Sequence, residues 1–98
     1  RDLLLLDEPF GALDALTRAS MQEWLLEVWQ AEAKTIVFVT HDVEEAVYLS
    51  DRVYVLSPRP ARVEQVLTID LPRPRARETT QDPRFIAYRE ALLEALGL

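Results

Sequence analysis

The chain has 98 residues, of which 49% are hydrophobic and 29% charged, a composition typical of a soluble globular domain. Its net charge of −6 argues against a nucleic-acid-binding protein, which would carry clustered Lys and Arg. With no cysteine, it has neither a disulfide framework nor a thiolate metal site, which is compatible with a reducing cytoplasm. No apolar run reaches the ~18 residues that span a bilayer, so any membrane role is expected to act through a partner.

Four consecutive leucines, Leu3 to Leu6, predict a strand that is buried on both faces, as in a parallel sheet covered by helices. Two carboxylates, Asp7 and Glu8, follow directly. Because side chains alternate across a strand, these acids are expected to leave the sheet toward different sides and to take separate roles. Pro9 then ends the strand, since it removes a ladder donor. Taken alone, the acidic pair could instead mark a polar strand end or a helix start.

A helix is predicted from about Ala15 to Ala31, with Asp14 as its N-cap. The apolar residues that fall largely at helical spacing are Leu16, Met21, Trp24, Leu25, Val28 and Trp29. The two tryptophans are interpreted as core or helix-packing residues, with a stacking platform for bases as the alternative.

The β-branched and aromatic run from Thr35 to Thr40 predicts a second buried strand. A strand, a helix and a further strand predict a right-handed crossover, which brings the ends of two parallel strands to one edge of the sheet. His41 and Asp42 follow at this edge, where ligands bind in α/β folds. A lone histidine is otherwise a packed or surface imidazole.

The elements expected after His41 rest on caps, prolines and alternating side chains. In order, they are a helix from Val43 to about Leu49 capped by Asp42, a strand from Arg52 to Leu56, a loop over 57–61, an edge or hairpin strand over 62–70 paired with the strand before it, and a helix that begins at Asp82-Pro83 and ends at Gly97. Prolines predict that residues 71–77 are extended, with exposed arginines. This Pro/Arg-rich segment is interpreted as a solvated linker, with a docking peptide as the alternative.

Residues 3–14 resemble the Walker B strand and D-loop of an ATP-binding cassette (ABC) transporter ATPase, in which apolar residues precede Asp-Glu-Pro, a short linker and Ala-Leu-Asp. The sequence Val39-Thr40-His41-Asp42 resembles the switch-histidine region of the same family. The resemblance implies that Asp7 is the magnesium-side acid and Glu8 the general base. It also implies that His41 reaches the γ-phosphate of ATP and that Asp14 is the D-loop aspartate. The fold expected is α/β, part of a P-loop NTPase parallel sheet with flanking helices.

The family's phosphate-binding loop has the form Gly-x-x-x-x-Gly-Lys-Ser/Thr, which cannot be written with the two glycines present, Gly11 and Gly97. The Leu-Ser-Gly-Gly-Gln signature is also missing. We therefore expect the C-terminal part of a longer protein, without the P-loop strand, that hydrolyses no ATP alone. Open sheet edges lead us to expect that the 98-residue chain either associates with other copies or is a partial view of a longer polypeptide. Residues 1–57 would belong to the ATPase core, and residues 58–98 would form a hairpin strand, a Pro/Arg-rich linker and a terminal helix.

The function implied is that of the cytoplasmic ATP-hydrolysing subunit of an ABC importer, using ATP and Mg²⁺. Such a subunit pairs with a second ATPase subunit and with permease subunits at the inner face of the cell membrane. Residues 71–77 resemble the tail of members that serve importers of nitrate, taurine and alkyl sulfonates. Gly11 departs from the family, because many members have Ser there. A DNA-repair or chromosome-maintenance ATPase and a non-catalytic assembly module are the alternatives.

Overall fold

The computed structural model describes residues 3–32, 35–57 and 62–98. The chain forms two compact units, residues 1–41 and residues 42–98. Each unit has one two-stranded sheet within the described residues. Of the predicted loop over 57–61, residues 58–61 lie outside the described residues. The predicted functional division after residue 57 is a division by motif and stays a prediction.

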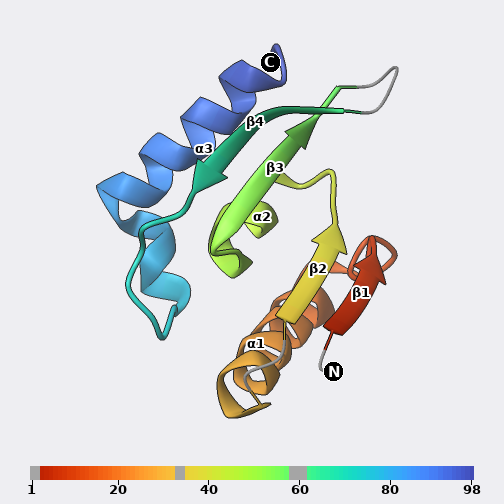
Figure 1. Ribbon diagram of the computed structural model, residues 1–98. Coiled ribbons are helices and arrows are strands. Elements are labelled where there is room, and N and C mark those ends of the chain that lie inside the picture. The colour runs from red at the N-terminus through yellow and green to blue at the C-terminus, as the bar shows by residue number, and fades with distance from the viewer. Residues whose placement is uncertain (1–2, 33–34, 58–61) are drawn as a thin grey trace. The chain divides into compact units, whose positions relative to one another are not determined.

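The first unit is a strand, a helix and a strand: β1 (Leu3–Asp7), α1 (Ala15–Glu32) and β2 (Thr35–Val39). The two strands pair in parallel and in register from their first to their last residue. Helix α1 runs back along the pair, so that both strands point the same way (Figure 1). The predicted crossover is therefore confirmed, and the C-terminal ends of β1 and β2 lie at one edge.

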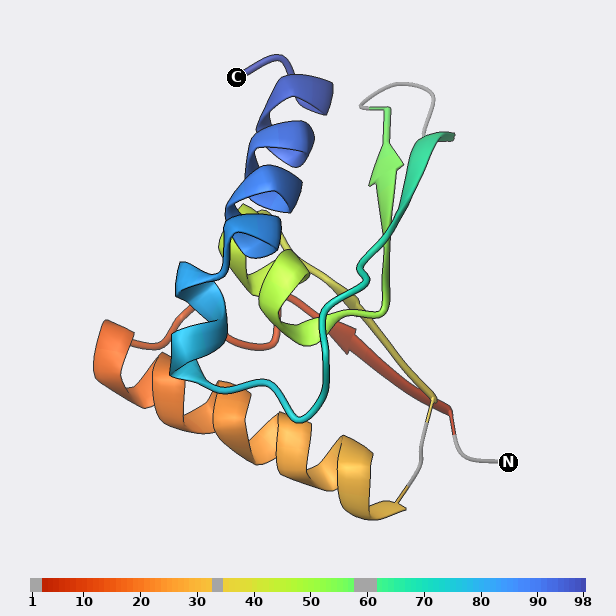
Figure 2. The ribbon, with the colours of Figure 1, turned by 90° about the vertical axis from the view of Figure 1, so that its left-hand side faces the viewer.

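The prediction that both strands are buried on both faces is wrong in this structure. Exposure alternates along each strand: one face is half-buried, while on the other Leu5 is 70% and Val39 51% exposed. Among the described residues of this unit, α1 is the helix that packs against the two strands, and it covers one face of the pair (Figure 2). Helix α1 also buries less than predicted. Leu25 is buried, but Trp24 is 52% exposed, so the core role predicted for that tryptophan is not observed.

The second unit contains α2 (Val43–Leu49), the antiparallel strands β3 (Arg52–Leu56) and β4 (Val63–Thr68), the short 3₁₀ helix η1 (Arg77–Gln81) and α3 (Pro83–Ala95). The predicted hairpin is confirmed, whereas η1 was not predicted. Helices α2 and α3 pack together on the same side of the hairpin (Figure 2). No described helix combines the length and the apolar character needed to cross a membrane.

The helix ends of the second unit follow the predicted capping chemistry. The carboxylate of Asp42 accepts the backbone N–H of Glu45 at 3.2 Å, and that of Asp82 accepts the N–H of Arg84 at 2.8 Å. Gly97 takes a positive φ of 78° just beyond α3, a conformation that glycine adopts without strain. The buried hydrophobic residues of this unit are Ala46, Val47, Tyr48, Leu49, Val55, Ile69, Leu71, Phe85 and Leu92.

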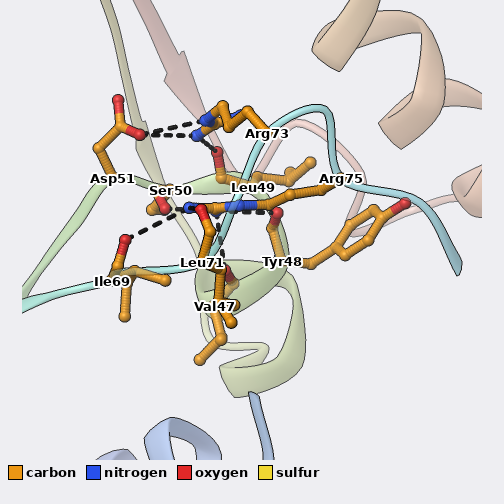
Figure 3. Close-up of polar contacts among 9 residues, drawn as sticks. All are labelled: Val47, Tyr48, Leu49, Ser50, Asp51, Ile69, Leu71, Arg73 and Arg75. Carbon is orange, nitrogen blue, oxygen red and sulfur yellow. Dashed lines mark hydrogen bonds and ion pairs between the residues drawn. The ribbon is translucent and has the colours of Figure 1, made fainter. Parts of the chain in front are cut away.

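The Pro/Arg-rich segment is not the solvated linker that its composition predicts. Arg75 is only 5% exposed, and its guanidinium donates to backbone carbonyls of Val47, Tyr48 and Ser50 at the end of α2. It also reaches the carbonyls of two residues just before it, Ile69 and Leu71, at 3.4 Å each. Figure 3 shows this guanidinium lying among the carbonyls. Segment 71–77 is therefore attached to α2.

Arg73 makes a second attachment beside the first. Its guanidinium donates to the Asp51 carboxylate at 2.9 and 3.2 Å and to the carbonyl of Leu49 at 3.0 Å (Figure 3). Arg77 is exposed and lies over the ring of Tyr48, with its guanidinium carbon 4.7 Å from the ring centroid. The prediction of three exposed arginines is thus correct for Arg77 and wrong for Arg73 and Arg75.

Candidate active site

The end of β1 presents the two carboxylates in different settings. Asp7 is the last residue of the strand, opposite Val39, and its exposed side chain shares the face of Leu3 and Leu5. Glu8 lies just past the strand, where its backbone N–H still donates to the carbonyl of Val39 at 2.8 Å. The pairing of the strands therefore fixes the backbone of both acids.

Glu8 has an unusual backbone conformation. Its φ is 49°, in the left-handed region that costs a non-glycine residue about 1–2 kcal/mol. Two consecutive tight turns follow, closed by the N–H of Gly11 to the carbonyl of Glu8 and by the N–H of Leu13 to the carbonyl of Phe10. The strain is thus held in place by the strand pairing before Glu8 and by the turns after it.

His41 meets Glu8 at the common edge of the two strands. The Nδ1 atom of His41 is in direct hydrogen-bond contact with Oε2 of Glu8, although the residues are 33 apart in the chain. The imidazole is 92% exposed and the carboxylate side chain 35% exposed. Because the Glu8 carboxylate accepts from Nδ1, Nε2 is the ring nitrogen left for an incoming ligand, and it donates to that ligand when the imidazole carries both ring protons. The pair combines a carboxylate that can accept a proton with an exposed imidazole.

Asp14 closes the loop that follows Glu8. Its carboxylate accepts the backbone N–H of Thr17 at 2.8 Å, which makes it the N-cap of α1, as predicted. This hydrogen bond from Thr17 holds the pKa of the Asp14 carboxyl below its usual range. The side chain is exposed at the start of the helix.

Asp7 offers a single carboxylate for a metal ion. Across the described ranges, no three His, Cys, Asp or Glu side chains are grouped so that they could hold a metal. Mg²⁺ is commonly bound by one or two carboxylates together with waters and substrate phosphates, not by an all-protein cage. One exposed carboxylate at the sheet edge fits that mode of binding, and it does not fit a structural metal.

Arg18 is a residue of this site that the sequence pattern did not single out. From the first turn of α1, its Nε donates to the carbonyl of Phe10 at 3.2 Å and its Nη2 to that of Leu13 at 2.6 Å. Both acceptors lie in the loop between Glu8 and Asp14. The feature of the sequence that could have indicated Arg18 is a cation in the first turn of a predicted helix, where the helix dipole usually favours acids.

The chain resembles curated ATP-binding proteins along most of its length, although no family model matches it. An ABC transporter ATP-binding protein of Methanocaldococcus jannaschii is 53% identical over 97% of the chain and 34% of that protein. Taurine import ATP-binding proteins of Pseudomonas savastanoi and Pseudomonas entomophila are 48% and 50% identical, over 96% and 93% of the chain. These matches cover 38% and 37% of the Pseudomonas proteins. The chain therefore spans less than half the length of these relatives.

Proposed function

The chain is homologous to ABC transporter ATP-binding proteins along nearly its whole length, and we propose that it carries the hydrolytic residues of such a subunit. The observation that supports this most directly is the contact between Glu8 and His41 at the end of two parallel strands. Because the chain spans under half of its relatives, the activity proposed is that of the intact protein, with ATP and Mg²⁺.

In this proposal each residue of the site has its own task. Glu8 orients the attacking water and accepts its proton, since its carboxylate is partly exposed and held by a fixed backbone. His41, held by Glu8 through Nδ1, directs Nε2 toward the γ-phosphate. Asp7 binds on the magnesium side, where the ion would neutralise charge on the phosphate oxygens. Asp14 keeps the intervening loop attached to α1 and stands where the family has its D-loop aspartate.

We further propose that the intact protein energises an importer of small anions such as taurine, nitrate or alkyl sulfonates. Two relatives named for taurine import support this class of solute. The subunit would work as a pair with a second ATPase subunit, bound to permease subunits at the cytoplasmic face of the membrane. Uptake of labelled taurine, nitrate and an alkyl sulfonate, in cells with and without the gene, tests the assignment. Unchanged uptake of all three solutes would contradict it.

Replacement of Glu8 by Gln in the intact protein tests the catalytic role. The amide keeps the shape of the side chain but cannot accept the proton, so turnover is expected to fall at least ~10²-fold while ATP binding is retained. Steady-state phosphate release and equilibrium binding of a fluorescent ATP analogue measure the two effects. Glu64→Gln, at an exposed position of β4, is the matched control. Turnover at the wild-type rate in Glu8→Gln would remove Glu8 from the mechanism.

A further inference from the structure

The loop between Glu8 and Asp14 is short and tightly closed. It contains two turns, each closed by one backbone hydrogen bond of 3.2–3.3 Å, and its two ends carry the two acidic side chains. The strand pairing holds the Glu8 end through the bond to Val39. The helix holds the Asp14 end through the cap to Thr17. What remains to be fixed is the middle of the loop, where the carbonyl of Phe10 closes the second turn and the carbonyl of Leu13 follows it.

Arg18 fixes that middle part. Its guanidinium binds the carbonyls of Phe10 and Leu13 through two different nitrogens, so that one planar group spans both turns. The side chain is partly buried, which strengthens both charge-assisted bonds relative to bonds in water. The Phe10 carbonyl also accepts from Leu13 N–H, so it receives two donors.

The position of this cation within the helix argues that it is there for the loop. Arg18 lies in the first turn of α1, whose dipole disfavours positive charge, and no acidic residue occupies that turn. A residue chosen only for helix stability would be an acid there. The unfavourable placement is offset by the two bonds to the loop. Arg18 therefore connects α1 to the segment that emerges from Glu8.

We infer that Arg18 is a positioning residue for hydrolysis, acting through the backbone of residues 8–14 on the placement of the Glu8 carboxylate. This inference rests on the function proposed for Glu8. Glu8 has a strained φ of 49°, and such a conformation persists only when several surrounding contacts hold it in place. If the bonds from Arg18 are lost, the loop can relax and the carboxylate moves relative to His41 and the attacking water. Misplacement of a catalytic group by about 1 Å can cost up to 10²-fold in rate.

Arg18→Lys in the intact protein tests the inference. Lysine keeps the charge and much of the side-chain length, but its single ammonium lacks the rigid planar fork that spans both carbonyls. We expect kcat to fall about tenfold, while KM for ATP changes by less than about twofold. Turnover is normalised to the protein that binds a fluorescent ATP analogue, so a partly misfolded preparation is judged only on its folded fraction. Arg52→Lys, at an exposed position of β3, is the matched control.

The double variant Glu8→Gln with Arg18→Lys separates action through Glu8 from an independent effect. With the carboxylate already removed, the lysine substitution is expected to lower single-turnover hydrolysis no further, because coupled residues are non-additive. A further tenfold loss in this background would overturn the inference, as would normal kcat in Arg18→Lys alone. If Glu8→Gln itself retains full turnover, the proposed role of Glu8 fails first. If Glu8→Gln is inactive and Arg18→Lys is normal, only the role of Arg18 fails.

Discussion

At the scale of single residues, the candidate site combines a strained acid with an exposed imidazole. Glu8 has a positive φ. At Gly11, close to Glu8, an added Cβ would lie 3.5 Å from Glu8 Oε1, which is an ordinary contact distance. A β-carbon at this position is therefore sterically compatible with this loop. Strain at Glu8 lowers stability, and the exposed imidazole of His41 adds nothing to a core, a combination characteristic of residues kept for function.

The exposure of His41 leads to a clear expectation for His41→Ala. The imidazole is 92% exposed, so its removal should change the melting temperature of the intact protein by no more than about 2 °C. If His41 has the proposed role, hydrolysis should slow by about 10²-fold, because the ring nitrogen proposed to contact the γ-phosphate is lost. Thermal melts without nucleotide and phosphate-release assays give the two numbers. Phe85→Ala, which truncates a side chain that is 1% exposed, serves as the control for a true core loss of about 3–5 kcal/mol.

A large fall in the melting temperature of His41→Ala, measured in the absence of nucleotide, would instead indicate a packed histidine. That outcome would also weaken the assignment of Nε2 to the γ-phosphate. The contact of Nδ1 with Glu8 would then be structural.

At the scale of elements, the seven residues of α2 are stabilised from a distant part of the chain. The last carbonyls of a helix have no partner within the helix. Here Arg75 binds the carbonyls of Val47, Tyr48 and Ser50, and Arg73 binds that of Leu49. Two cations beside the negative end of the helix dipole are favourably placed. The short helix thus owes its C-terminal end to the Pro/Arg-rich segment.

The cost of removing this attachment can be estimated for Arg75→Met. The substitution relieves the desolvation of a buried charge but leaves several buried carbonyls without a donor, at about 1–3 kcal/mol for each unsatisfied group. Water can replace part of the lost hydrogen bonding to these carbonyls, so we expect a net loss of about 2–4 kcal/mol in the free energy of unfolding. Urea unfolding of the intact protein measures it. Arg84→Met, which breaks a surface pair with Asp82, is the control and should leave the free energy of unfolding nearly unchanged.

The pH dependence of the Arg75 effect follows from its pKa. Burial, followed by the neighbouring charge of Arg73, lowers the pKa of Arg75 to about 10. The folded protein therefore bears the cost of this charge at neutral pH, and the cost is relieved only as the pH rises through about 10. Between pH 6 and 8 the group is charged in both states. The loss caused by Arg75→Met should be the same across that range, and a loss that varied with pH there would contradict the assignment.

Much of the secondary structure and part of the site could be predicted from local pattern. Leucine and β-branched runs gave β1 and β2, and the crossover between them brought Glu8 and His41 to one edge. The environment of Arg75 could not be predicted, because its partners at the end of α2 lie 25–28 residues earlier, while the prolines beside it indicate solvent. The positive φ of Glu8 and the role proposed for Arg18 likewise depend on contacts that no local sequence pattern predicts.

At the scale of the whole molecule, each unit is described by itself, and the first leaves much apolar surface uncovered. One face of the β1–β2 pair presents Leu3, Leu5, Val37 and Val39, which are 49–70% exposed. Within the described residues, β1 and β2 pair only with each other, so each has an open edge. Exposed apolar patches and open strand edges of this kind recruit other chains.

We therefore predict that residues 1–98, produced alone, self-associate at micromolar concentration. Burial of the β1–β2 face removes apolar surface from water, and that gain is about 25 cal/mol for each Å² buried. Sedimentation velocity over a concentration series measures the association. The double substitution Leu5→Lys with Val37→Lys places two charges on the face and should shift the distribution toward monomer. Leu98→Lys, at an 83% exposed position after α3, is the control and should leave the distribution unchanged. A monomer that melts sharply and cooperatively would contradict the prediction.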